Sequence, residues 1–245
     1  MKTFLNGVHA IQNALEHDVE NITQLWVAEN KRNPRIDKVV KEAQRLGLKA
    51  QNMTPSAMDR MTGSRKHQGI VAEYMAPDAT SENELFELVT NTEGSLLLLV
   101  LDGVTDPHNL GACLRTAEGA GVHAVIAPKD NAANLTPTAR KVASGAAERM
   151  PFVQVTNLAR TLQMLKDAGV WVTGTSDKAT QTMYECDFKG HSAIIMGAEG
   201  KGLRRLTETA CDHLISIPMA GSVSSLNVSV ATGVVLYEAV RQRQV

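Results

Sequence analysis

The chain has 245 residues, 43% of them hydrophobic, which is enough for one large globular domain or two modest ones. Its formal net charge of −1 gives no global signal for nucleic acid, and aromatic residues at 4% leave few platforms for stacking single-stranded bases. Three widely spaced cysteines (Cys113, Cys186, Cys211), no secretory pattern at the N-terminus and no aliphatic run longer than Leu96–Leu101 predict a reduced, cytoplasmic protein with no metal and no membrane span.

Residues 1–75 alternate between helical and strand patterns, which predicts a small α/β domain. We expect helices over 7–16, 33–47 and 55–63 and strands over 22–28, 48–53 and 68–75. Pro34 and Gly47 are typical start and stop signals for the second helix. This segment carries 11 Lys and Arg against 8 Asp and Glu. That excess suits a phosphate backbone or an ordinary solvated helix face equally well.

Residues 76–94 have a different composition, with five acidic side chains, no basic ones, and several Pro, Ser, Thr and Asn. We expect an acidic linker here, with a short helix over 84–89, between two domains.

Residues 95–245 open with the continuous apolar run LLLLVLDG at 96–103, which is typical of a parallel strand buried on both faces. Strand and helix patterns then alternate with short connections, and this predicts an α/β domain with a mostly parallel sheet. Asn109 is a plausible cap for the first helix, and Pro137 for the start of the next, over 136–148. The last helix is expected from 226 to 243.

Three loops of unusual chemistry follow predicted strands of this sheet: DGVTDPHNLGA (102–112), MGAEGKG (196–202) and PMAGSVSSLN (218–227). Ligands of such sheets bind beyond the carboxyl ends of the strands, so we expect the three loops to converge. The stretch GSVSSLNVSVATG (221–233) has small, uncharged polar side chains, which suit a neutral or weakly charged organic ligand. A plain Ser-rich loop before a helix is the alternative.

Several common catalytic motifs are absent from these loops. They contain no GxxxxGK[ST] phosphate loop, no GxGxxG fingerprint and no GxSxG nucleophile elbow. A dinucleotide-dependent oxidoreductase and a serine hydrolase are therefore poorly supported. Taken alone, Arg115 is more typical of a solvent-facing helix position than of a place in the crevice.

Three segments of this domain resemble, in sequence and in order, the three motifs of the SpoU branch of the SPOUT RNA methyltransferases. They are DGVTDPHNLGACLRTAEGAGV, IIMGAEGKGL and ISIPMAGSVSSLNVSVATGVVLYEAV. The resemblance covers about 150 residues at the C-terminal end. The N-terminal GVHAIQNAL and KHQGIVA resemble a substrate-binding domain similar to ribosomal protein L30e. Over the whole chain, the resemblance is to bacterial members that methylate a guanosine 2′-oxygen in the peptidyl-transferase P loop of 23S rRNA.

The resemblance implies an L30e-like RNA-binding domain over 1–75 and a SPOUT (α/β knot) domain with a deep trefoil knot over 95–245. It implies a homodimer formed through the C-terminal domain and S-adenosylmethionine as cofactor. By motif position, Gly197, Ile217 and Leu226 are expected to contact the cofactor, largely through main-chain groups, with three neighbours: Thr175, Met196 and Met219.

The family's proposed catalytic set carries over to five residues of this chain: Asn109, Arg115, Glu199, Ser225 and Asn227. The implied reaction is in-line methyl transfer to the ribose 2′-hydroxyl. An arginine base is proposed in the family, but arginine stays protonated in proteins, and anchoring a phosphate or orienting an oxygen suits it better. The identity of the base therefore stays open.

Basic residues of the first domain are candidate rRNA contacts: Lys31, Arg32, Arg35, Lys38, Arg65, Lys66 and His67. RNA of this kind is read through shape, unpaired bases and 2′-hydroxyls. Two alternatives remain for the whole chain, namely a tRNA 2′-O-methyltransferase and a catalytically silent RNA-binding factor of ribosome assembly. The second predicts damaged motifs, whereas Asn109, Arg115, Glu199 and Asn227 are all present.

Overall fold

The computed structural model describes residues 2–29, 33–75 and 80–244. The chain divides into two compact units, Met1–Asp78 and Ala79–Val245. The division falls within a few residues of the end predicted for the first domain. In the part of the chain that is described, no helix combines the length and apolarity that a membrane crossing requires.

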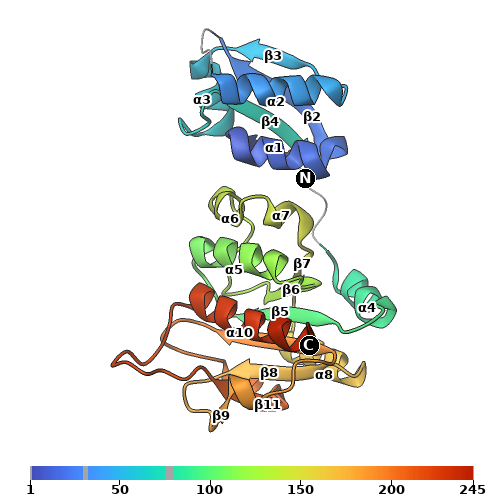
Figure 1. The fold of residues 1–245 in the computed structure, drawn as a ribbon, viewed down its shortest axis with the longest axis vertical. Helices are drawn as coiled ribbons and strands as arrows, with labels where there is room; N and C mark the ends of the chain where they lie inside the picture. Colours follow the sequence, from blue (N-terminus) through green and yellow to red (C-terminus); the bar gives the residue numbers. More distant parts are fainter. Residues whose placement is uncertain (1, 30–32, 76–79, 245) are drawn as a thin grey trace. The chain divides into compact units, whose positions relative to one another are not determined.

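The first unit is a four-stranded sheet with helices on both faces (Figure 1). Its strand order is β1-β4-β2-β3, with β4 antiparallel to β1 and β2, and with β3 parallel to β2. Helices α1 and α2 cover one face, and α3 covers the other with the buried Met58. The bounds are β1 Lys2–Asn6, α1 Val8–His17, β2 Ile22–Ala28, α2 Pro34–Arg45, β3 Ala50–Met53, α3 Pro55–Thr62 and β4 Ile70–Met75. Strand β1 was missed by the sequence analysis because its five residues show no clear alternation.

The second unit is built on a seven-stranded sheet of order β7-β6-β5-β10-β8-β11-β9, in which every described pairing is parallel. The strands are β5 Leu97–Asp102, β6 Ala124–Pro128, β7 Phe152–Val155, β8 Trp171–Thr175, β9 Gln181–Thr182, β10 Ser192–Gly197 and β11 His213–Ser216. The predicted α/β fold with a parallel sheet is confirmed.

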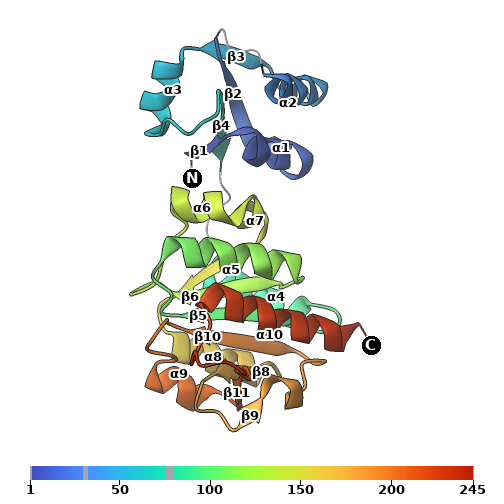
Figure 2. The same ribbon diagram turned by 60° about the vertical axis from the view of Figure 1, so that its left-hand side comes forward.

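Two helical layers cover this sheet (Figure 2). On one face lie α5 and α10, with α6 and α7 packed on the outer side of α5. On the other lie α4, α8 and α9. The helices are α4 Glu82–Asn91, α5 Pro107–Gly119, α6 Pro137–Ala143, α7 Ala146–Arg149, α8 Leu158–Asp167, α9 Arg205–Ala210 and α10 Val228–Arg243.

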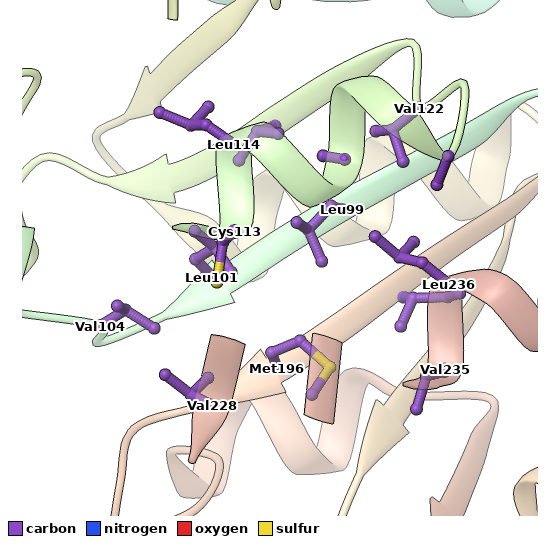
Figure 3. Packing of buried hydrophobic residues seen from close by; sticks show 14 of the residues in the cluster. Leu99, Leu101, Val104, Cys113, Leu114, Val122, Met196, Val228, Val235 and Leu236 are labelled. Carbon is purple, nitrogen blue, oxygen red and sulfur yellow. The ribbon is translucent and has the colours of Figure 1, made fainter. Parts of the chain in front are cut away.

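Strand β5 shows why an unbroken apolar run becomes a central strand. All six of its residues are buried. Successive side chains point to opposite faces of a sheet. Leu99 and Leu101 therefore pack against α5 and α10, as Figure 3 shows, while Leu98 and Val100 join the core under α4 and α8. This double burial fixes the end of β5, and hence the loop that follows it.

The segment predicted as an acidic linker is mostly a helix. Of residues 76–94, positions 76–79 lie outside the described residues. Helix α4 begins after Ser81, whose side chain forms a capping box with Glu84. Leu85 and Val89 are buried in the core of the second unit. The linker interpretation is therefore wrong for residues 82–91, because an apolar stripe on this acidic helix packs against the sheet.

The helix predicted over 136–148 is divided in the structure. It begins at Pro137 as expected, but Ser144 (φ 52°) and Gly145 (φ 93°) adopt left-handed conformations and separate α6 from α7. Helix α6 lies so close to α5 that a Cβ at Gly111 would come within 2.4 Å of the Ala139 carbonyl oxygen. Glycine at 111 thus permits the close approach of these two helices.

The end of α10 is fixed to the beginning of the second unit. The Arg243 guanidinium donates to four main-chain carbonyl oxygens, those of Ser95, Leu96, Phe188 and Gly190, at 2.7–2.9 Å. Partial burial lowers the pKa of Arg243 from its usual range. Four acceptors compensate this desolvation and join segments that are far apart in the sequence.

Candidate active site

A cavity of about 650 Å³ opens where β8, β10 and β11 end. It is lined by residues 175–178 at the end of β8, by residues 196–203 at the end of β10 and by part of the segment 217–228 after β11. The volume lies within the range of small-molecule sites. Two of the three predicted loops form this cavity, and the third reaches its rim through Asn109, as described below.

All six residues expected to contact a cofactor line the cavity: Thr175, Met196, Gly197, Ile217, Met219 and Leu226. Four of them give an apolar wall suited to a flat heterocycle, and Lys178 and Lys201 bring positive charge to the lining. Thr175 Oγ1 donates to the Ile195 carbonyl oxygen at 3.0 Å. This bond ties the end of β8 to the neighbouring strand β10.

The loop after β11 offers its main chain to a ligand. Among the described residues, no backbone hydrogen bond engages positions 218–226. Ser222, Ser224 and Ser225 make no side-chain hydrogen bond there either, and all three are exposed. Unpaired main-chain donors and acceptors beside an apolar wall match adenine edges and ribose hydroxyls. The small side chains of GSVSSLN leave that backbone accessible.

Glu199, Asn109 and Asn227 form one hydrogen-bonded cluster that joins all three loops. Glu199 Oε1 accepts from Asn109 Nδ2 at 3.3 Å, from the Val228 backbone N–H at 3.4 Å and from Asn227 Nδ2. Asn227 Nδ2 also donates to Asn109 Oδ1 at 3.0 Å. The second oxygen of Glu199 has no hydrogen-bond partner among the described residues, so it remains available as an acceptor.

Helix capping orients the Asn227 amide and leaves the Asn109 amide free. Asn227 is the N-cap of α10, and its Oδ1 accepts from the Ser229 backbone N–H at 3.0 Å, which leaves Nδ2 to donate toward Glu199. The predicted cap at Asn109 is wrong, because Asp106 caps α5 and accepts from His108 N at 2.8 Å. Asn109 therefore lies in the first turn of the helix, with its side chain free to join the cluster.

The other two catalytic candidates lie outside this cluster. Ser225 is an exposed residue of the cavity wall. Arg115 is exposed on α5, with its Nη1 at 3.5 Å from Ser144 Oγ in the turn between α6 and α7. Arg115 thus lies about two turns along α5 from Asn109, where a guanidinium can meet an approaching phosphate.

One ion pair near the site was missed by the sequence analysis. Asp102 ends β5 with no exposed surface; its Oδ2 accepts from the Arg204 backbone N–H at 2.9 Å, and its Oδ1 lies 3.1 Å from Arg204 Nε. The pair fixes the end of the 198–204 loop to the end of β5. Asp102 was recognisable as a polar residue closing a buried strand, whereas nothing in the sequence linked it to Arg204.

The RNA-contact candidates divide into three groups. Arg35 and Lys38 on α2, and Arg65 and Lys66 after α3, are exposed. Lys31 and Arg32 lie outside the described residues. His67 differs from the expectation: it is 6% exposed, and both ring nitrogens are engaged inside the unit, so its ring is not available to a phosphate.

In the described part of the chain, no group of three or more His, Cys, Asp or Glu side chains is placed to hold a metal ion.

Family comparisons agree with this geometry. Residues 96–237 match the model of the SpoU rRNA Methylase family, and residues 4–79 match that for RNA 2′-O ribose methyltransferase substrate binding. The chain belongs to the SpoU rRNA methylase family. All three loops of the SpoU site fall within the first match, and the loop carrying Arg65 and Lys66 falls within the second.

Similar SpoU proteins cover nearly the whole chain. A relative from Ralstonia nicotianae, named 23S rRNA (guanosine-2′-O-)-methyltransferase RlmB, is 54% identical over 98% of this chain and 96% of its own. The protein of the same name from Haemophilus influenzae is 50% identical over 99% of both chains. The crystal structure of the SpoU methyltransferase AviRb from Streptomyces viridochromogenes, in complex with the cofactor AdoMet, has a TM-score of 0.81 and 25% identity, and covers 99% of this chain and 91% of that one.

Proposed function

We propose that this protein transfers a methyl group from S-adenosylmethionine to the ribose 2′-oxygen of a guanosine in 23S rRNA. The observation that carries the proposal is the Asn109–Glu199–Asn227 cluster at the rim of a cofactor-sized cavity. The relatives named for this reaction supply the nucleotide and the RNA. The P loop as the target region is supported by the sequence resemblance.

The residues of the cavity suit the cofactor by their chemistry. Met196, Ile217, Met219 and Leu226 offer an apolar surface, and the unpaired main chain of 218–226 offers donors and acceptors. Lys178 and Lys201 are the cationic partners available to a carboxylate. S-adenosylmethionine supplies a methyl group already activated by a sulfonium, so the protein's task is chiefly positioning.

The chain's own residues act on the RNA at the rim. Glu199 and the two asparagines form a hydrogen-bonded polar group in which the free carboxylate oxygen can accept a hydrogen bond from the ribose hydroxyl. Arg115, exposed along the same helix as Asn109, anchors a neighbouring phosphate. Ser225 holds the loop side of the cavity. Removal of the hydroxyl proton then falls to this group or to water.

We also propose that the chain forms a homodimer through the second unit, adopts the trefoil knot of its superfamily and acts in the cytoplasm. Val230 and Tyr237, each more than half exposed, give α10 an apolar outer side that supports self-association. The position of β10 between β5 and β8 supports the knot. Three free cysteines support a reducing compartment. Light scattering across protein concentrations tests the dimer.

Methyl transfer from labelled S-adenosylmethionine onto unmethylated 23S rRNA, followed by digestion to nucleosides, tests the proposed function. We expect 2′-O-methylguanosine at one P-loop position, lost in Asn109→Ala and Arg115→Ala. Label on tRNA but not on 23S rRNA would replace the proposal with the tRNA reaction. Cofactor binding without transfer to any RNA would support a silent assembly factor.

A further inference from the structure

The loop between α3 and β4 of the first unit, residues 63–69, carries two adjacent cations. The Arg65 side chain is 93% exposed, and Lys66 is exposed beside it. Neighbouring like charges on a flexible loop repel each other and lose conformational entropy when they bind. A loop that presents both to one ligand therefore benefits from being held in place beforehand.

Hydrogen bonds fix this loop at both ends. At its start, Thr62 Oγ1 donates to the Met58 carbonyl oxygen at 2.9 Å and accepts from Ser64 N at 3.3 Å, and Ser64 Oγ accepts from Lys66 N at 3.1 Å. At its end, Gln68 adopts a left-handed φ of 59° and its Oε1 accepts from Val8 N at 3.3 Å. The backbone that carries the two cations is thus defined on each side of them.

His67 fixes the middle of the loop. Its Nδ1 accepts from Gly69 N at 3.0 Å, so the ring proton lies on Nε2, which donates to Asp59 Oδ1 at 3.1 Å. The other oxygen of Asp59 lies 4.0 Å from Arg65 Nε. One carboxylate on α3 therefore holds the buried ring and restrains the base of the exposed arginine.

We propose that His67 is a positioning residue: through Asp59 and Gly69 it holds the 63–69 loop so that Arg65 and Lys66 bind the phosphate backbone of the RNA substrate. This inference rests on the proposed function. Rigid placement of the two cations lowers the entropic cost of binding, and phosphate contacts of this kind add affinity without reading the RNA sequence.

The test uses salt dependence, because removing one phosphate interaction lowers the slope of log affinity against log salt by about 1. We expect Arg65→Ala/Lys66→Ala in the full-length protein to weaken binding of a 23S rRNA fragment about tenfold and to lower the slope by about 2, with kcat unchanged. His67→Ala removes a ring that carries no charge in this tautomer. It should nevertheless lower the slope and raise the KM for RNA, with kcat and the KM for S-adenosylmethionine unchanged.

The combination of the two variants decides between positioning and general structural damage. In the Arg65→Ala/Lys66→Ala background, His67→Ala should add less than about twofold, because residues that act as a unit are not additive. Asp59→Asn keeps an acceptor for Nε2–H and should restore most of the binding that Asp59→Ala loses. Met58→Ala leaves a cavity in the core under α3, the helix that carries Asp59, and is the matched control. It should leave the slope of log affinity against log salt unchanged.

An equal effect of His67→Ala in both backgrounds, or an unchanged slope in His67→Ala, overturns the inference. So does a Met58→Ala variant that reproduces the His67→Ala slope. Should His67→Ala not fold, His67→Asn and Asp59→Asn carry the same comparison. Methyl transfer by the unaltered protein, measured in parallel, separates this inference from the proposed function. If the protein transfers methyl groups but the effects of the variants on RNA binding are additive, only the positioning role is removed. If it binds 23S rRNA without transfer, only the proposed function is removed.

Discussion

At the scale of single residues, the side-chain amide of Asn227 performs two tasks, one through its oxygen and one through its nitrogen. Its oxygen caps α10 and its nitrogen donates to Glu199 and Asn109. The sequence resemblance identified this residue, and a cap before an apolar helix is readable from sequence. The hydrogen bond to Glu199 could not be predicted from the sequence, because Glu199 lies in another loop, 28 residues away along the chain.

Asn227→Asp separates the two tasks. The carboxylate still caps α10, but it places a negative charge against Glu199, and like charges at this separation repel strongly. We expect kcat to fall about a hundredfold, which corresponds to about 2.7 kcal/mol in the barrier. Circular dichroism should show an unchanged helix content. A kcat within twofold of the original would mean that the amide donor is not needed.

Cys113 provides a residue-scale test of burial. It has no exposed surface, and burial raises the pKa of its thiol to about 11. Because the thiolate is the reactive form, Cys113 should resist Ellman's reagent at pH 8 in the folded protein and react fully in denaturant. Mass mapping of the modified peptide measures this. Rapid labelling without denaturant would show that the core around α5 opens.

At the scale of elements, α5 and α6 show what the sequence could and could not predict. Pro137 marked the start of α6 in the sequence, and the structure begins the helix there. The left-handed turn at Ser144 was not predicted, because serine carries no signal for positive φ. The role of Gly111 was not predicted either, because the close approach of α6 to this position is seen only in the folded structure. The short helix α9 was missed for lack of any periodic pattern.

Gly111→Ala tests this packing. Its Cβ would lie 2.4 Å from the Ala139 carbonyl oxygen, so α6 must shift, and we expect a loss of about 2–3 kcal/mol in unfolding free energy. The shift also moves Ser144 away from Arg115 and should lower activity. Gly233→Ala in α10 is the matched control, since its nearest neighbour is Thr116 Cγ2 at 3.6 Å.

The Gly233→Ala control should leave the unfolding free energy unchanged or raise it by up to about 1 kcal/mol, because alanine has a higher helix propensity than glycine. Urea denaturation of both variants measures the difference. Equal stabilities would show that α6 accommodates a methyl group at no cost.

At the scale of the whole molecule, an ion pair on α10 links stability to pH. The Arg241 guanidinium donates twice to Glu238, and this, with a bond from Gln242, lowers the pKa of Glu238 to about 2. This pKa lies below the value near 4.5 that the carboxyl has in the unfolded chain. The ionised carboxylate therefore stabilises the fold fully above about pH 4.5, and this stabilisation is lost as the pH falls toward 2.

Glu238→Gln should therefore cost about 1 kcal/mol at pH 7, a small value because Arg241 is largely solvated. The difference in unfolding free energy from the original protein should shrink between about pH 5 and pH 2. Denaturation curves over that range check the trend. A difference that stays constant with pH would assign the loss to the Gln242 network rather than to charge.

The overall architecture was accessible from sequence because alternating strand and helix patterns fix an α/β class, and because the three motifs name the family. The order of the strands was not. Placing β10 between β5 and β8 requires pairing strands about 95 and 20 residues apart, which no local pattern specifies. The acidic segment was misjudged for the same reason, since its buried side chains are defined only by the sheet they cover.

The contacts of Arg243 have a consequence for synthesis of the protein. Its carbonyl partners at Ser95 and Leu96 are made 148 and 147 residues earlier, which at cellular translation rates is roughly ten seconds or more. The first unit can close during this interval. Strand β5 must remain an unpaired apolar segment on its β10 side until β10 is made about 95 residues later, and Arg243 completes the unit only after that. The emerging second unit is therefore a natural client for chaperones until α10 has left the ribosome.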